Sequence, residues 1–231
     1  MNNIKLDPRL SAVASLVRRG SKVADVGTDH GYLPAYLVLN GVSPSAVAGD
    51  VRIGPLENAR KTVAELGLSD KIETVLSDGL KSFKVNCADD IIIAGMGGIL
   101  IGEILSACHW VKNENIKIIV QPMTHPENTR EFFIKNSFEI CEELAVSDGK
   151  HCYCVISARF TGKEKTYPAG YTYYGELIRK RDETSVLYLH TQLNRLIKRY
   201  EALTKAESQL SEINYLKNVI DDFKRVMEEN K

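Results

Sequence analysis

The stretch that decides the fold is Val23-Ala-Asp-Val-Gly-Thr-Asp-His-Gly-Tyr-Leu-Pro34, in which a short apolar run leads into a glycine-containing loop and then into a helical pattern. A strand that turns into a helix in this way offers the unpaired N–H groups of the helix N-terminus to a carboxylate or a phosphate. The loop reads Asp-x-Gly-x-x-x-Gly, with Asp29 where a further glycine is usual. It therefore predicts a site for a charged nucleoside cofactor, with an additional carboxylate in the loop.

Seven runs rich in β-branched residues predict strands, and helical patterns separate the first five of them. The runs are residues 22–26, 46–50, 71–76, 90–94, 117–121, 138–147 and 152–160. Each of the first five ends at a polar or glycine-containing turn, and in a doubly wound parallel sheet such turns meet in one crevice. Asp148-Gly149 predicts a hairpin between the last two runs. The expected fold of residues 1–160 is α/β, with a Rossmann-like sheet that ends in a hairpin.

Residues 161–231 have a different pattern. A polar connector with glycine and proline, residues 161–170, is followed by about sixty residues without a strand pattern. Apolar residues recur there in steps of three and four, which is typical of a coiled-coil seam. The two runs are Leu189, Leu193, Leu196, Tyr200 and Leu203, and Ile213, Leu216, Ile220, Phe223 and Met227. We expect a second, C-terminal domain of two helices folded back as a coiled-coil hairpin; one continuous helix with a stutter is the alternative.

The overall composition limits the possible partners. The 231 residues include 30 basic and 30 acidic residues, so binding to nucleic acid would need a local basic patch. Basic residues gather near the start of the chain and in the C-terminal region, where a solvated helix face is the alternative interpretation. No run approaches the ~18 apolar residues of a membrane helix, and no signal-peptide core is present, so we expect a cytoplasmic protein without a membrane partner.

The five cysteines are scattered, without Cys-x-x-Cys spacing. This pattern favours reduced thiols over a disulfide framework, and we expect no metal. No feature indicates an obligate protein partner.

Two acidic residues strengthen the interpretation of the loop. Asp50 follows Gly31 by nineteen residues, at the end of the second predicted strand, where a carboxylate can accept both ribose hydroxyls. Asp78 follows the third predicted strand, where folds of this class commonly bind an adenine amino group. A helix cap or a turn is the alternative role of each one alone. Their joint placement favours a nucleoside site.

The two cofactors to compare are a nicotinamide dinucleotide and S-adenosylmethionine (SAM). The Gly-x-Gly-x-x-Gly pattern of dinucleotide sites is absent. Asp29 would place a negative charge beside a pyrophosphate, whereas SAM carries a sulfonium and an ammonium group. The loop therefore favours SAM.

The fourth predicted strand ends in Ala94-Gly-Met-Gly-Gly98, where glycines let the backbone approach a ligand closely. Tight packing of strand and helix is the structural alternative. Methyltransferases that act on exocyclic amines usually have Asn/Asp-Pro-Pro-aromatic at this place, and that motif is missing. Its absence indicates another acceptor atom, such as a ring nitrogen.

Five segments together resemble the TrmK family of bacterial tRNA (adenine-22 N1) methyltransferases. They are Thr28-Asp-His-Gly-Tyr-Leu-Pro34, Gly49-Asp50 with Gly54-Pro-Leu56, Ser77-Asp78-Gly79-Leu80, Ala94-Gly-Met-Gly-Gly98 and Gln121-Pro122-Met123. The resemblance covers about residues 6–160. It implies a Rossmann-like class I SAM-dependent methyltransferase fold, tRNA as substrate, and a C-terminal coiled-coil domain.

The residues expected to contact SAM come from the turns described above and from the N-terminal segment. They are Arg9, Gly27, Thr28, Asp29, His30, Gly31, Asp50, Asp78, Gly79, Gly95, Met96 and Gly97. Arg9 could hold either the methionine carboxylate or a tRNA phosphate. Transfer requires that adenine N1, the methyl carbon and the sulfur of SAM be aligned. We expect Asp29 to accept a hydrogen bond from the adenine N6 amine and to stabilise the cation that develops on the base.

Other roles near this loop are open at the level of sequence. His30 is either a structural donor or a proton-transfer residue, and Tyr32 either stacks on the flipped-out base or packs on the sheet. Two further functions stay open: a SAM-dependent methyltransferase with another acceptor, and a catalytically silent SAM-binding or RNA-binding module.

Overall fold

The computed structural model describes residues 4–206 and 209–230, and its centre is a seven-stranded sheet in the order β3-β2-β1-β4-β5-β7-β6. The strands are β1 (Val23–Val26), β2 (Ala46–Asp50), β3 (Ile72–Leu76), β4 (Asp90–Gly97), β5 (Lys117–Thr124), β6 (Phe138–Asp148) and β7 (His151–Phe160). β1 to β5 are parallel, whereas β7 is antiparallel to both β5 and β6. The predicted parallel sheet with a terminal hairpin is confirmed.

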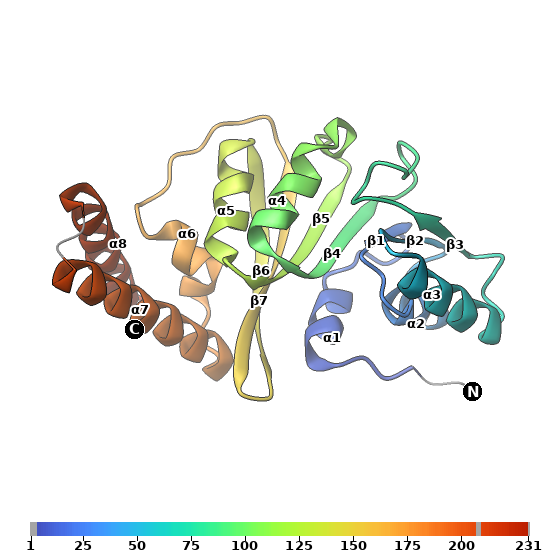
Figure 1. Cartoon of the computed structure of the whole chain (residues 1–231), viewed down its shortest axis with the longest axis horizontal. Helices are drawn as coiled ribbons and strands as arrows, with labels where there is room; N and C mark the ends of the chain where they lie inside the picture. The colour runs from blue at the N-terminus through green and yellow to red at the C-terminus, as the bar shows by residue number, and fades with distance from the viewer. Residues whose placement is uncertain (1–3, 207–208, 231) are drawn as a thin grey trace.

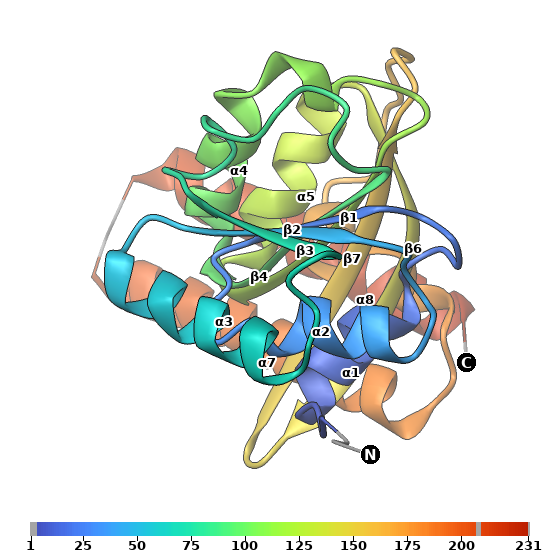
Figure 2. The same ribbon diagram turned by 90° about the vertical axis from the view of Figure 1, so that its right-hand side faces the viewer.

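Helices cover both faces of the sheet (Figure 2). α1 (Pro8–Ser15), α2 (Tyr32–Leu39) and α3 (Ile53–Glu65) lie on one face, and α4 (Gly98–Ser106) and α5 (Pro126–Lys135) lie on the other. A short 3₁₀ helix, η1 (His109–Val111), follows α4. The central strands are apolar at consecutive positions because both of their faces are covered: Ile92 packs on the side of α1, and its neighbours Ile91 and Ile93 pack on the opposite side.

β4 and β5 extend three residues beyond their predicted ends. Gly95 has a φ of +78°, which glycine adopts without steric cost, and the register shifts between Ala94 and Met96. Pairing then resumes between Met96 and Pro122 and continues to Gly97. The expected turn of glycines is therefore an irregular continuation of the strand.

The C-terminal region consists of α6 (Tyr171–Tyr174), the 3₁₀ helix η2 (Gly175–Arg179), α7 (Glu183–Lys205) and α8 (Leu210–Glu229). α7 and α8 lie together at the end of the molecule farthest from β3 (Figure 1), and we call this pair the arm. Asp182 begins α7 by accepting a hydrogen bond from the Ser185 N–H at 2.9 Å. Arg199 of α7 and Glu212 of α8 form an ion pair at 2.7 Å. This region therefore contains two helices, and the alternative of one continuous helix is wrong.

The arm shares the hydrophobic core of the sheet. The buried seam residues of both helices belong to the same cluster of packed side chains as β4 and β5. Tyr188 of α7 is buried, and its hydroxyl lies 3.4 Å from Cys154 Sγ in β7. The buried seam residues are Leu189, Leu193, Leu196, Leu216, Ile220 and Phe223. One continuous core therefore joins the sheet to the arm.

A buried ion pair holds the segment between sheet and arm. Arg130 of α5 and Glu143 of β6 have fully buried side chains and meet through Nε–Oε1 at 2.7 Å and Nη2–Oε2 at 3.2 Å. Arg130 Nη1 also donates to the backbone carbonyls of Thr172 and Tyr173, at 2.9 and 3.3 Å. We call this group of four residues the latch, because it binds α6 to the sheet.

The five cysteines are all free thiols, and burial raises the pKa of Cys154 to about 11. Among the described residues, no group of three or more His, Cys, Asp or Glu side chains is arranged to hold a metal ion. None of the helices described is both long and apolar enough to cross a membrane.

Candidate functional site

The glycine loop connects β1 to α2 at the point where the strand order reverses. Gly27 and Gly31 have φ angles of +84° and +69°, and the N–H groups of Gly27 and Thr28 donate to Gly49 O at 2.8 and 2.9 Å. The positive φ of Gly27 favours glycine, and the absence of a side chain leaves room for Met96 Cε, which would lie 2.2 Å from a Cβ atom at this position. Among the described residues, no side chain caps the N-terminus of α2, so its N–H groups are open to a ligand.

Asp25 is a carboxylate inside an otherwise apolar strand. Its side chain is buried, and this burial raises its pKa to about 6; the Thr28 hydroxyl opposes the shift, and the negative charge of Asp50 adds to it. Thr28 Oγ1 is itself buried and makes no hydrogen bond of standard geometry with the described residues. An unpaired buried hydroxyl beside a buried carboxyl group with a raised pKa is the local signature of a site that a polar ligand completes.

Asp50 ends β2 beside the loop, as predicted. The side chain is buried, and its Oδ1 accepts from the Arg52 N–H at 2.8 Å. No hydrogen bond to the described residues uses its second oxygen, which suits an acceptor for ligand hydroxyls. The turn that follows β3 lies beside Asp50, because the Ser77 N–H donates to Asp50 O at 2.9 Å.

Asp78 and Gly79 follow β3 in that neighbouring turn. The Asp78 side chain is exposed and forms an ion pair with Lys81 at 2.5 Å. Gly79 has a φ of +57° and its carbonyl accepts from Ser77 Oγ at 2.9 Å. The turn thus has a fixed backbone and a carboxylate that faces solvent.

Asp29, His30 and Tyr32 form an exposed group at the opening of the loop. The Asp29 side chain is 66% exposed and its Oδ2 lies 3.4 Å from His30 Nε2. The rings of His30 and Tyr32 are stacked, with centroids 5.3 Å apart. Carboxylate, imidazole and phenol are therefore all presented at the same edge of the loop.

Arg9 and Gln121 connect the turn of β4 to more distant segments. Gln121 Oε1 accepts from the Gly95 N–H at 3.2 Å and from Arg9 Nη1 at 3.3 Å. The Arg9 guanidinium also pairs with Asp7 and with Asp148, at 3.0 Å each. Arg9, one of the residues expected to contact SAM, thus lies near the turn of β4, and its Nε, Nη1 and Nη2 atoms each donate a hydrogen bond within the protein.

The predicted residues lie at one end of the sheet, on four adjacent strands. Contacts join the glycine loop to Gly49-Asp50 and to Met96, and Gln121 joins the neighbouring Gly95 to Arg9. Sequence reasoning assigned no role to Asp25 or Gln121. The signal for Asp25 was a charged residue inside a buried apolar strand, and the signal for Gln121 was an uncharged polar residue inside the buried strand β5.

The chain is similar to proteins that modify tRNA. The family model "Methyltransferase domain" matches residues 6–156. Over 167 residues, 72% of this chain and 70% of the relative, the sequence is 37% identical to tRNA (adenine(22)-N(1))-methyltransferase of Bacillus subtilis (strain 168).

Two solved structures match nearly the whole chain. The crystal structure of the B. subtilis M1A22 tRNA methyltransferase TrmK covers 99% of this chain and 100% of its own, at 29% identity and a TM-score of 0.83. A putative tRNA (m1A22) methyltransferase of Streptococcus pneumoniae, solved in complex with S-adenosyl-L-methionine, covers 96% and 100%, at 30% identity and a TM-score of 0.78.

Proposed function

Since the chain belongs to the TrmK family of tRNA (adenine-22 N1) methyltransferases, we propose that it transfers the methyl group of SAM to N1 of adenine 22 in tRNA. The observation that carries this proposal is the glycine loop, which has buried acceptors on its inner side and the exposed carboxylate of Asp29 at its opening. A cofactor and a base can therefore approach the loop from different sides.

The residues around the loop fit SAM. Thr28 Oγ1 is an unpaired buried hydroxyl, Asp50 has an unused oxygen, and the N-terminus of α2 is uncapped. Asp50 would accept the ribose hydroxyls, and Asp78 with Gly79 would contact the adenine ring. The backbone of Gly27, Thr28 and Gly31, together with Gly95, Met96 and Gly97, would surround the methionine end. SAM supplies a methyl group on a positively charged sulfur.

Asp29 is the proposed catalytic residue. Adenine N1 has an in-plane lone pair, so it needs no general base before it attacks. The product is a cation until its N6 amino group loses a proton, and a carboxylate within reach stabilises that charge. Asp29 would accept the N6 hydrogen bond and then the proton, while His30 and Tyr32 beside it would contact the flipped-out base.

We assign residues 1–160 to a catalytic domain and residues 161–231 to a helical domain that acts as a coiled-coil hairpin. The 3–4 spacing of the seam and the Arg199–Glu212 ion pair support the hairpin. The arm would supply basic contacts to tRNA phosphates, and the reaction would take place in the cytoplasm, where its substrate is.

Labelled SAM and unmodified bulk tRNA test the proposed function. We expect transfer of label to tRNA and a reverse-transcription stop at position 22, because N1 methylation blocks the Watson–Crick edge of adenine. A stop elsewhere, or none despite transfer, would favour another acceptor. SAM binding without transfer would favour a catalytically silent module.

A further inference from the structure

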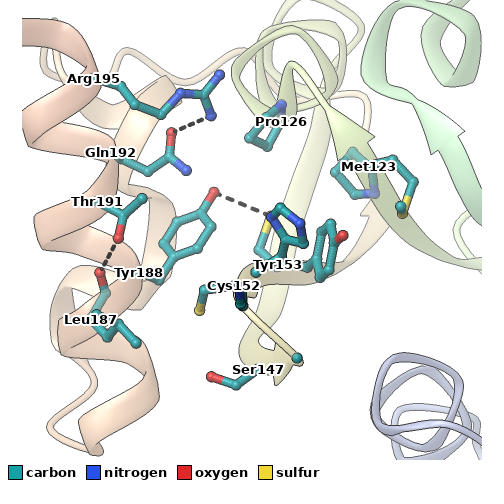
Figure 3. A pocket seen from close by; sticks show the side chains of 15 residues that line it. Met123, Pro126, Ser147, Cys152, Tyr153, Leu187, Tyr188, Thr191, Gln192 and Arg195 are labelled. Carbon is teal, nitrogen blue, oxygen red and sulfur yellow. Dashed lines mark hydrogen bonds between the residues drawn. The ribbon is translucent and has the colours of Figure 1, made fainter. Parts of the chain in front are cut away.

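A crevice of about 390 Å³ separates the arm from the β6–β7 hairpin. We call it the arm crevice. One wall comes from α7 and includes Thr191, Gln192 and Arg195; the other includes Tyr153 of the hairpin and Met123 at the end of β5 (Figure 3). Its volume is at the lower end of the ~300–1,000 Å³ that is usual for ligand sites.

The two formally charged side chains that line the arm crevice, Lys150 and Arg195, are both basic. His151 lines it as well, and none of the described Asp or Glu residues does. All three side chains are exposed, and neither Lys150 nor Arg195 has an acidic partner within 4.0 Å in the described part of the chain. In a chain with equal numbers of basic and acidic residues, such a local excess favours a polyanion.

Aromatic rings accompany these charges. The rings of His151 and Tyr153 lie 6.1 Å apart at 45°, and the Arg9 guanidinium lies 5.7 Å from the centre of the Tyr153 ring. Proteins hold unpaired nucleotides with this combination, in which a base stacks on an aromatic ring and cations contact the phosphates.

The arm crevice lies next to the candidate site. Met123 lines it, and Met123 Sδ lies 3.3 Å from Arg9 Nη1. Arg9 in turn contacts Gln121, whose Oε1 accepts from the Gly95 N–H. Two side chains therefore span the path from the crevice to the turn of β4.

We propose that the arm crevice binds an unpaired nucleotide of tRNA adjacent to the adenine that is methylated. The base of this nucleotide packs on His151 and Tyr153, and its phosphates contact Lys150 and Arg195. This inference rests on the proposed function. A base can leave its stack only if the neighbouring backbone is held open, and the arm crevice is placed to do that.

The test uses the full-length protein, unmodified tRNA transcript and SAM. The variants are Lys150→Ala, Arg195→Ala, their combination, His151→Ala and His151→Tyr. Lys71→Ala is the matched control, because it removes the same charge at the opposite edge of the sheet, beside β3. Dissociation constants for tRNA are measured over a range of salt concentrations, and those for SAM and the unfolding midpoints are measured in parallel.

Each cation that contacts a phosphate should lower the slope of log affinity against log salt by about 1 when it is removed. His151→Ala should weaken tRNA binding about 5- to 100-fold, and His151→Tyr should restore it, since a ring is kept. The affinity for SAM should be unchanged in every variant, and Lys71→Ala should bind tRNA as the wild type does. Unaltered tRNA affinity and salt slope in the double variant, with a wild type that methylates tRNA, would overturn the inference. A wild type that binds SAM and does not modify tRNA would overturn the proposed function as well.

Discussion

Asp29 is accessible in a loop that is otherwise tightly constrained. Gly27 packs on Met96, Thr28 is buried, and the one ion pair that the Asp29 carboxylate makes among the described residues is with His30, at 3.4 Å. An exposed carboxylate of this kind contributes little to folding stability. Its place at the opening of the loop is therefore better explained by what the loop binds than by what the fold needs.

Replacing Asp29 with Asn should separate catalysis from folding. The side chain keeps its size and loses the charge that would stabilise a cationic base, so we expect kcat for tRNA methylation to fall about 10- to 100-fold. SAM affinity and the unfolding midpoint should stay close to those of the wild type. Steady-state kinetics with calorimetric SAM titration measure both effects, and wild-type turnover in this variant would remove Asp29 from the mechanism.

Asp25 should make stability depend on pH in a direction opposite to that of most carboxylates. The folded protein raises its pKa from 3.8 to about 6, so the folded state holds the proton to higher pH than the unfolded chain does. The associated stability is present below about pH 4 and is lost as the pH rises to about 6. Asp25→Asn mimics the protonated form and keeps its stability as the pH rises. The free energy of unfolding of the variant, measured relative to that of the wild type, should therefore increase by about 1 to 3 kcal/mol from pH 4 to pH 7.

Urea denaturation of both proteins across this pH range measures the difference. Asp78→Asn is the matched control, because that carboxylate is exposed and its charge is already accessible to water. An equal difference at pH 4 and pH 7 would mean that Asp25 ionises alike in both states.

At the scale of elements, local composition predicts the strands well. β2 has its predicted bounds, because an apolar run ends at a carboxylate, and β4 extends further because Gly95 allows a bulge that no periodicity indicates. Contacts between distant segments were beyond sequence reasoning. Arg9 meets Asp148 across 139 residues, and no local pattern pairs them. The loop residues were predictable because strand ends converge; the contacts of Arg9 were not, because they depend on how α1 packs against the hairpin.

The latch joins three elements and should be sensitive to the loss of either charge. Arg130→Met leaves Glu143 buried without its partner, which should cost about 3 to 5 kcal/mol of unfolding free energy. Arg130→Met with Glu143→Leu removes both charges and should recover much of that loss. Urea denaturation of the two single variants and the double variant gives the coupling energy, and additive effects would show that the pair acts as two independent residues.

At the scale of the whole molecule, the arm is joined to the catalytic part by packed side chains. Deleting everything after Phe160 would remove Tyr188 from its place on Cys154 and would uncover the latch. Such a deletion would alter the catalytic part together with the arm. Single substitutions in α8 are therefore the sharper way to examine what the arm does.

Leu216→Ala should loosen the arm and leave the SAM site intact. Leu216 is 1% exposed between α8 and α7, and truncating a buried leucine costs about 2 to 5 kcal/mol. Leu210→Ala, on the same helix at 71% exposure, is the matched control and should change stability by less than about 0.5 kcal/mol. We expect Leu216→Ala to weaken tRNA binding with unchanged SAM affinity. Calorimetry for SAM and filter binding for tRNA measure the two, and a loss of both affinities would contradict independent sites.

The continuous core between sheet and arm has a geometrical consequence. Because packed side chains run from Ile91 in β4 to Phe223 in α8, the span between the arm and the opening of the glycine loop is fixed. A rigid protein that holds RNA at one point and reacts at another chooses its nucleotide by distance along the RNA. An adenine would then be selected by its separation from the nucleotide that the arm crevice holds, so that inserting one nucleotide between the two would move or abolish methylation whatever the inserted base.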